Sequence, residues 1–176
     1  LGIEHHQIRP SINIDYSETP PIEGKYVCIA IHGTAQTKYW NNPNGWQETV
    51  DYLKSNGYKV VLVSYENDGY MGNKHPEGII TPEDKSFKSI SNYIKHSDLF
   101  IGISSGISWL AWAIGTPIVL ISGFTEPYTE FKGEDVARII NKSVCNGCFN
   151  KHRLDPSDWN WCPVHKGTEK QFECTK

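Results

Sequence analysis

The chain has 176 residues, of which 38% are hydrophobic and 21% are charged, and its formal net charge at pH 7 is -3. This composition is typical of a soluble globular domain and excludes a largely disordered chain. Because basic residues are not in excess, the sequence gives no sign of nucleic-acid binding. No apolar run approaches the roughly 20 residues that a membrane-spanning helix needs.

The chain begins with Leu1 rather than Met, so we expect it to be a piece of a longer protein. Residues 1–24 show no sustained hydrophobic periodicity and contain Pro10, Pro20 and Pro21. This pattern predicts a linker or an edge segment. The first residues form neither the basic region nor the apolar region of a signal peptide.

Four short apolar runs are typical of strands that are buried on both faces of a sheet. They occupy residues 26–32, 58–64, 99–103 and 117–122. Helical patterns lie between the runs: one begins near Trp46 and stops before Gly57, one follows Pro82, and one spans residues 106–114. Strands that alternate with helices predict an α/β fold, with a Rossmann-like parallel sheet and flanking helices.

Ligands of such sheets bind at the carboxyl ends of the strands. Ser104, Ser105 and Gly106 come directly after the third predicted strand and open a helix. The N–H groups at a helix N-terminus, with their partial positive charge, favour an anion such as a diphosphate. A plain helix N-cap with a tight turn is the alternative interpretation.

Candidate residues also follow the other strands. Lys38 comes after the first strand and can neutralise phosphate oxygens, although many loop lysines are simply solvated. Glu66 ends the second strand, where a carboxylate binds ribose hydroxyls in many nucleotide sites; a surface carboxylate is the alternative. Thr125 lies in residues 123–127, which follow the fourth strand and are placed to close over the same ligand. His32 is predicted to be a structural histidine.

Four of the five cysteines lie in the last 32 residues, at Cys145, Cys148, Cys162 and Cys174. A Cys-x-x-Cys pair lets two sulfurs converge on one ion, and two further thiolates complete a tetrahedral set. The pattern predicts a structural four-cysteine site for iron or zinc. Two disulfides are the alternative, which a cytosolic location disfavours, and we expect the protein to be cytoplasmic.

Several segments together resemble a known family. The segments 32–40, 101–117 and 123–127 resemble the C-terminal half of heptosyltransferase-type GT-B glycosyltransferases, in which that half binds the sugar donor. The cysteine-containing segments resemble the bacterial autotransporter O-heptosyltransferases; they are residues 140–150, 158–163 and 171–174.

The resemblance implies an enzyme that transfers heptose from ADP-heptose to Ser or Thr side chains of an autotransporter passenger protein. It also implies iron at the four cysteines and a homo-oligomer, a dodecamer in the family. The acceptor site and the catalytic base are expected in an N-terminal half that this sequence lacks. No nucleic acid and no membrane span are implied.

Residue by residue, the resemblance gives Lys38 the catalytic, phosphate-binding position, and places Glu66 near the nucleoside-binding acid. Ser105 and Gly106 match the phosphate turn. The wider family usually has Asp where this chain has Ser104, and it has His where this chain has Trp109. Sugar contacts are therefore not carried over to those two positions.

The predicted organisation is a linker or edge segment at residues 1–24, a donor-binding Rossmann-like domain at residues 25–141, and a metal-binding tail at residues 142–176. Two other functions fit the same residues. One is a noncatalytic nucleotide-binding or assembly module with a structural metal site. The other is a sugar-nucleotide epimerase-type GT-B domain, although such enzymes do not need the cysteines.

Overall fold

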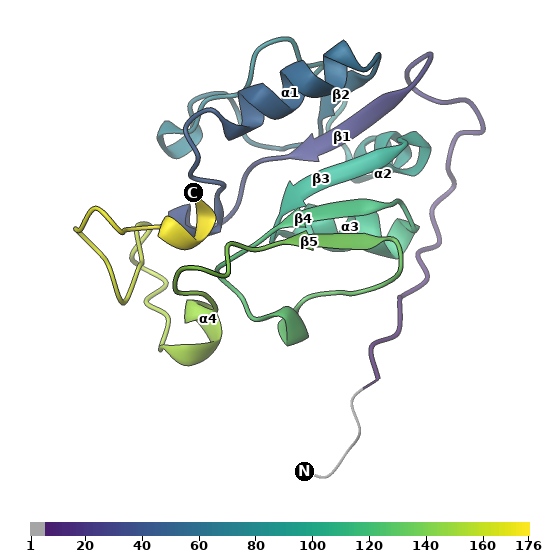
Figure 1. Ribbon diagram of the computed structural model, residues 1–176. Helices are drawn as coiled ribbons and strands as arrows, with labels where there is room; N and C mark the ends of the chain where they lie inside the picture. The colour runs from purple at the N-terminus through teal and green to yellow at the C-terminus, as the bar shows by residue number, and fades with distance from the viewer. Residues whose placement is uncertain (1–5) are drawn as a thin grey trace.

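The computed structural model describes residues 6–176 and contains one five-stranded sheet (Figure 1). The strands are β1 (Tyr26–Ala30), β2 (Lys59–Leu62), β3 (Leu99–Ile103), β4 (Ile118–Ile121) and β5 (Val136–Ile139). Their order across the sheet is β2-β1-β3-β4-β5, and every neighbouring pair is parallel. All carboxyl ends therefore meet at one edge of the sheet.

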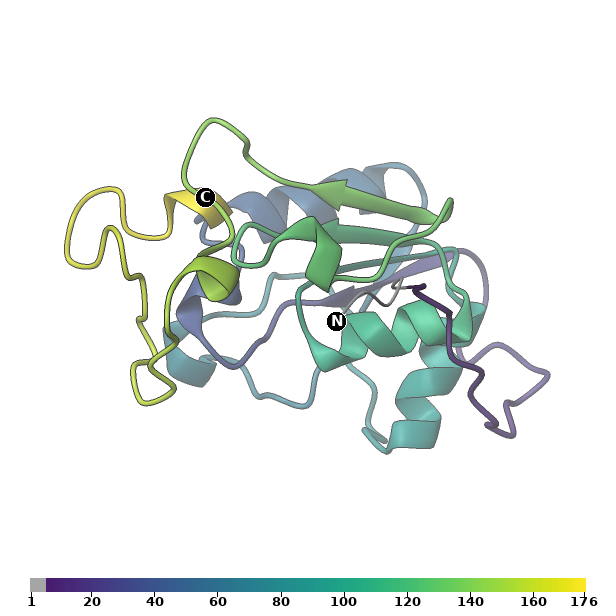
Figure 2. The same ribbon diagram turned by 90° about the horizontal axis from the view of Figure 1, so that it is seen from below.

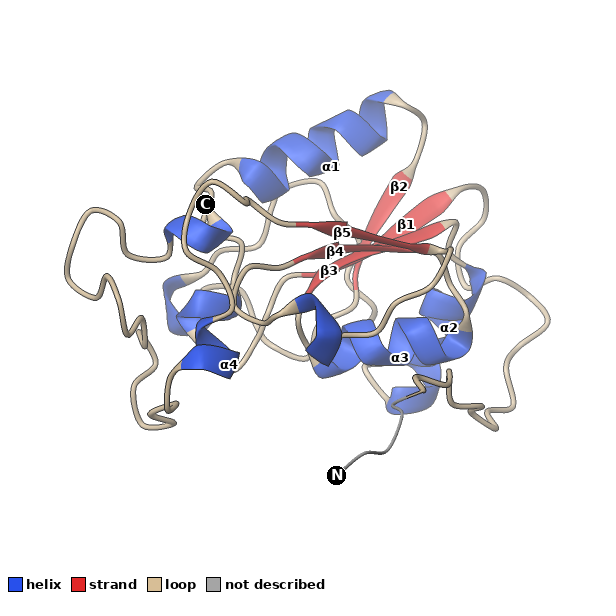
Figure 3. Cartoon of the chain, turned by 60° about the horizontal axis from the view of Figure 1, so that its bottom comes forward, coloured by secondary structure: helices blue, strands red, loops and turns tan. Residues whose placement is uncertain are grey.

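Helices cover both faces of the sheet. The three longer helices are α1 (Gly45–Ser55), α2 (Phe87–His96) and α3 (Gly106–Ile114). Figure 3 shows α1 on one face, with α2 and α3 together on the opposite face. This three-layer arrangement confirms the predicted parallel sheet with flanking helices.

Two hydrophobic clusters, one on each face, hold the layers together. Against α1, Val27 and Ile29 of β1 pack with Val50 and Leu53. Against α2 and α3, the other side chains of the same strand pack with residues such as Ile90. Because alternate residues of β1 to β4 enter different clusters, these four strands read as unbroken apolar runs. Each fully buried aliphatic side chain contributes about 1.5–3 kcal/mol.

The structure confirms the four predicted strands and three predicted helices, and differs in detail at two places. Helix α2 begins at Phe87 rather than at Pro82, because the Ser86 hydroxyl caps it by accepting the Ser89 N–H at 3.2 Å. Strand β5 was not predicted. It is an edge strand with alternating half-buried and exposed residues, so its sequence lacks a continuous apolar run.

Residues 6–24 form an extended arm that adds no strand to the sheet; residues 1–5 of the predicted linker or edge segment lie outside the described residues. The arm lies across α2 and α3 (Figure 2). Arg9 pairs with Asp135 at 2.7 Å and lies 5.6 Å from the Trp112 ring, while Ile22 packs against the core. The arm therefore covers one helical layer of the domain.

The chain from residue 141 onward contains short turns and the four-residue helix α4 (Cys148–Lys151). It lies beyond the carboxyl ends of the strands (Figure 1). Within residues 6–176, no helix is long and apolar enough to cross a bilayer.

Candidate functional site

A cavity of about 420 Å³ opens where β1, β2 and β3 end. Four of the predicted site residues line it, namely Lys38, Glu66, Ser105 and Gly106. The remaining lining residues are His32, Gly33, Thr34, Ser64, Tyr65, Tyr70, Phe87, Ile107 and Leu110. The structure thus brings together residues that are up to 68 positions apart in the sequence, from Lys38 to Gly106.

Lys38 reaches this cavity from a short 3-10 turn, η1 (Gln36–Lys38). Its ammonium group lies 3.5 Å from the Thr34 hydroxyl. Burial lowers the pKa of Lys38, and the nearby Glu130 carboxylate partly offsets that effect. A half-buried cation whose one hydrogen bond among the described residues is long is well suited to bind a phosphate oxygen.

The start of α3 supplies the neutral part of an anion site. Ser105 is the N-cap residue, but its side chain makes no capping hydrogen bond, so the first N–H groups of the helix remain available. A Cβ at Gly106 would meet no atom within 4 Å, which shows that the space in front of the turn is open. Backbone N–H groups facing open space at a helix start favour an anion.

The two other predicted binding residues, Ser104 and Thr125, do not line the cavity. Both are buried, and both hydroxyls donate to Oε1 of Glu130 at 2.5 Å. Glu130 is only 3% exposed, and within the described residues its Oε2 atom has no hydrogen-bond partner. Arg138 completes the cluster by donating to the Thr125 carbonyl at 2.9 Å.

Glu130 is a site residue that sequence reasoning missed. It lies in an irregular segment between β4 and β5, where a single acidic residue carries no spacing signal. Its importance is visible only in three dimensions, since it accepts two hydroxyls and influences both Lys38 and Arg138.

His32 lies at the base of the cavity and is 8% exposed. Its Nδ1 atom is 2.6 Å from the Ser64 hydroxyl, and its ring packs edge-on against His75, with 5.2 Å between the ring centroids. Burial, followed by the charges of His75 and Lys85, lowers the pKa of His32 to about 4. A histidine that is neutral at pH 7 and packed among rings fits the predicted structural role.

All four C-terminal cysteines are free thiols, and Cys148, Cys162 and Cys174 are buried. Burial and then the charges of Cys145 and Cys162 raise the pKa of Cys148 to about 11. Burial and then the charges of the other three raise the pKa of Cys174 to about 12. Within residues 6–176, no three His, Cys, Asp or Glu side chains form a group that could hold a metal ion in the observed arrangement.

The four thiols nevertheless fit a metal site in chemical type. Cys145 and Cys162 raise the pKa of Cys148, and these three raise the pKa of Cys174, as expected of thiols that lie near one another. Four thiolates suit iron or zinc. Gly147, between the first two, has a φ of +73°, which permits the tight turn that the spacing predicts. Cysteine binds a metal as the thiolate, so a metal at these residues would require the thiols to ionise.

A parallel sheet with a helix start and a cavity at its carboxyl edge is typical of nucleotide-binding α/β domains. The family model of glycosyltransferase family 9 (heptosyltransferase) matches residues 3–155. The chain belongs to this family.

Comparison with individual curated proteins shows which members of the family this chain is similar to. The chain is 42% identical to the autotransporter heptosyltransferase Aah of Escherichia coli, over 185 residues that cover all of this chain and 46% of Aah. TibC, an autotransporter heptosyltransferase of Escherichia coli O78:H11, is 42% identical over all of this chain and 44% of TibC. The inactive autotransporter heptosyltransferase BimC of Burkholderia thailandensis is 34% identical over all of this chain and 42% of BimC.

Solved structures of TibC are also similar to this chain. The crystal structure of TibC, an iron-containing dodecameric glycosyltransferase from enterotoxigenic E. coli, matches with a TM-score of 0.83 and 39% identity, over 94% of this chain and 45% of TibC. TibC in complex with ADP-D-beta-D-heptose gives the same TM-score at 40% identity, over 94% and 44% of the two chains. These findings confirm the resemblance to the autotransporter heptosyltransferases. The chain spans less than half the length of the curated relatives it matches.

Proposed function

We propose that this chain is the donor-binding part of a protein O-heptosyltransferase. The whole enzyme transfers heptose from ADP-heptose to Ser or Thr side chains of an autotransporter passenger protein. The observation that carries the proposal is the similarity of the entire chain to Aah and TibC, at 42% identity to each. The structural likeness to TibC in complex with ADP-heptose supports the same donor.

In the proposed site, Lys38 and the N-terminus of α3 at Ser105 and Gly106 bind the diphosphate. As the bond from the sugar to the diphosphate breaks, negative charge grows on the departing ADP. A fixed cation and fixed N–H groups stabilise that charge more strongly in the transition state than in the bound donor. Glu66, which also lines the cavity, accepts hydrogen bonds from the ribose hydroxyls in the proposed site.

Ser104 and Thr125 belong to the site through Glu130. Their hydroxyls hold the Glu130 carboxylate in place, and that carboxylate favours the charged form of Lys38. These two residues therefore support donor binding from beneath the cavity, as part of its electrostatic environment.

For the tail at residues 142–176, we propose an iron site, with zinc as the alternative, held by Cys145, Cys148, Cys162 and Cys174. TibC is iron-containing, and the free, mutually interacting thiols of this chain support the same chemistry. Four thiolates leave no open coordination position, so the ion would cross-link the tail. Residues 25–141 form the proposed donor-binding domain.

The proposals for assembly and acceptor rest on the same relatives, and a proposal for location is made with them. We propose a homo-oligomer, since TibC is a dodecamer, and an autotransporter passenger as the acceptor, since Aah and TibC are autotransporter heptosyltransferases. The proposed location is the cytoplasm, where free thiols stay reduced.

The test is heptose transfer to a passenger protein by the full-length enzyme. Lys38→Ala should lower turnover by about 100-fold, the size of effect seen when one charge-stabilising group is removed from an active site. Lys170→Ala, at an exposed lysine outside the cavity, is the matched control and should leave turnover unchanged. Turnover of Lys38→Ala equal to that of the control would remove Lys38 from the mechanism.

A second candidate is a noncatalytic nucleotide-binding or assembly module, because the relative BimC is an inactive autotransporter heptosyltransferase and is 34% identical over the whole chain. Binding of ADP-heptose without any transfer by the full-length protein would favour this candidate. Membership in a glycosyltransferase family leaves the epimerase alternative without support.

A further inference from the structure

The C-terminal part of the chain makes several of the contacts that hold the loop carrying Lys38, and Asn73 and Trp46 make others. Residues 34–41, here called the lysine loop, contain only the three-residue turn η1. A single 3-10 turn is not stable by itself in water. The contacts that define the loop's conformation must therefore come from elsewhere in the molecule.

Trp159 supplies the first set of contacts. The Gln36 N–H donates to the Trp159 carbonyl at 2.9 Å, and the Trp159 indole N–H donates back to Gln36 Oε1 at 3.3 Å. The Trp159 ring also packs against Tyr39, with 5.8 Å between ring centroids. Gln36 opens the turn that ends at Lys38, and Tyr39 follows it, so Trp159 contacts residues on both sides of the lysine.

The end of the chain supplies the second set. The Asn41 N–H donates to the Thr175 carbonyl at 2.5 Å, and the Asn41 side-chain amide donates to the Thr175 hydroxyl at 2.8 Å. The same amide donates to the Gln36 carbonyl at 3.0 Å. Asn41 thus links the two ends of the lysine loop to the residue that follows Cys174.

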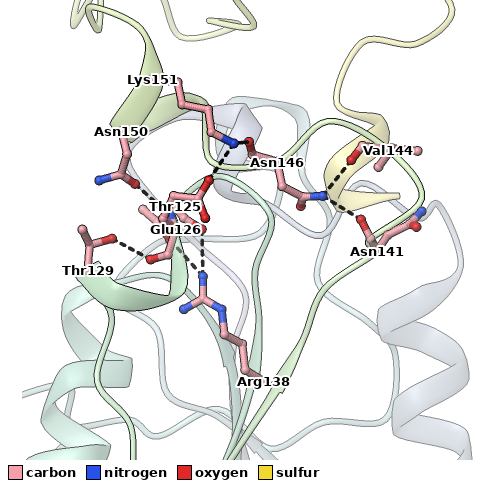
Figure 4. A network of polar contacts seen from close by, with 9 residues as sticks. All are labelled: Thr125, Glu126, Thr129, Arg138, Asn141, Val144, Asn146, Asn150 and Lys151. Atoms are coloured by element: carbon pink, nitrogen blue, oxygen red, sulfur yellow. Dashed lines mark hydrogen bonds and ion pairs between the residues drawn. The ribbon is translucent and has the colours of Figure 1, made fainter.

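The tail is itself anchored on the other side of the sheet edge, at the loop that follows β4. Figure 4 shows Lys151 paired with Glu126 at 2.6 Å, and the Glu126 N–H donating to the Asn150 side chain at 2.8 Å. A Cβ at Gly123 would collide with the Cys174 carbonyl, so this loop and the tail are in direct contact. The tail therefore connects the loops that follow β1 and β4.

We propose that residues 145–176 act as a clamp that positions Lys38 for the donor diphosphate, with Trp159 as the principal positioning residue. This inference rests on the proposed function, because it assumes that Lys38 binds the donor. Within residues 6–176, the hydrogen bond to Thr34 at 3.5 Å is the one that the Lys38 ammonium makes, so its place depends on the backbone of the lysine loop, which the clamp helps to hold. Without the clamp, the loop has to become ordered when the donor binds, and the affinity falls.

The test is the affinity of the full-length protein for ADP, measured by titration calorimetry, together with the metal content of each sample. Trp159→Ala should weaken ADP binding about tenfold while the metal content stays unchanged. Trp159→Phe keeps a ring but loses the indole N–H, and should weaken binding about threefold. Val164→Ala, at a 47% exposed residue of the same tail, is the control and should bind ADP as the unmodified protein does.

A double-mutant comparison distinguishes the positioning of Lys38 by Trp159 from a purely structural role of Trp159. If Trp159 acts through Lys38, Trp159→Ala should have less than a twofold effect on ADP affinity once Lys38→Ala is present. Equal effects in both backgrounds, or an unchanged affinity of Trp159→Ala, would overturn the clamp. If Trp159→Ala does not fold, the effects of Asn41→Ala and Trp159→Phe on ADP affinity are compared in the same way, with and without Lys38→Ala. Failure of the unmodified protein to bind ADP would instead contradict the proposed function itself.

Discussion

The sheet and the C-terminal tail are stabilised in different ways. Two large hydrophobic clusters cover both faces of the sheet, and strand pairing joins all five strands. The tail has one small cluster, in which Cys148 and Trp161 pack with Phe124 of the loop after β4, and its helices are the four-residue α4 and the 3-10 turn η4 (Glu173–Thr175). The sheet therefore owes its fold to apolar burial, whereas the tail depends on contacts with neighbouring loops and, in the proposed function, on a metal ion. The comparison predicts that the two regions respond differently to the same perturbation.

The largest expected effect is on the sheet. Phe100 of β3 is fully buried, so Phe100→Ala should lower the free energy of unfolding by about 3–5 kcal/mol. Trp161→Ala, in the tail, should lower it less but should make residues 142–176 sensitive to protease. Urea unfolding and limited proteolysis measure the two effects. Equal losses of stability would contradict the distinction between the two regions.

His32 links the stability of the sheet edge to pH. Its pKa is about 4 in the folded chain and 6.5 in the reference state, so between these values the unfolded chain binds more protons. Stability should therefore fall by about 2 kcal/mol as pH drops from 6.5 to 4.5. His32→Gln should flatten this dependence in urea titrations at several pH values. An unchanged pH dependence would show that His32 is not the titrating group.

Glu130 tests the buried polar cluster beneath the cavity. Glu130→Gln removes the charge near Lys38 and Arg138 and weakens the hydrogen bonds from Ser104 and Thr125, so it should destabilise the fold by about 1 kcal/mol. The exposed Glu134 is the matched control, and Glu134→Gln should have no measurable effect. Thermal unfolding of both variants measures the difference in stability. Similar melting temperatures would argue against a stabilising role of Glu130.

The smallest effect on the sheet is expected from metal removal. Chelation should change the free energy of unfolding of the sheet by less than about 1 kcal/mol, because neither hydrophobic cluster contains any of the four tail cysteines. The same treatment should expose the tail to protease. Amide hydrogen exchange, read separately for β1 to β4 and for residues 142–176, tests both statements. Loss of protection throughout the sheet would show that the tail is essential for the whole fold.

Prediction from the sequence succeeded for strands and helices that have a clear hydrophobic pattern. The strands at residues 26–30 and 99–103 are continuous apolar runs, and helix α3 begins at Gly106, directly after Ser104 and Ser105. Parallel topology then brings Lys38 and Ser105 to one cavity. Strand β5 escaped prediction because an edge strand is only half buried.

The polar connections could not be predicted in the same way. Glu130 lies in an irregular segment, and Trp159 contacts Gln36 across 123 positions of sequence. Hydrogen bonds between such distant loops leave no periodic pattern, because they depend on how loops meet at the sheet edge. The cysteine spacing and the resemblance to a family predicted a metal site in the tail, but neither indicated the contacts between Trp159 and the lysine loop.

The most direct test of the central claim is titration calorimetry of the full-length protein with ADP-heptose and ADP, repeated with Lys38→Ala. The account predicts that the unmodified protein binds both ligands and that Lys38→Ala weakens both by at least about tenfold, since one charged hydrogen bond contributes about 1.5–3 kcal/mol. Equal affinities of the two proteins, or no binding by either, would contradict a donor site built around Lys38.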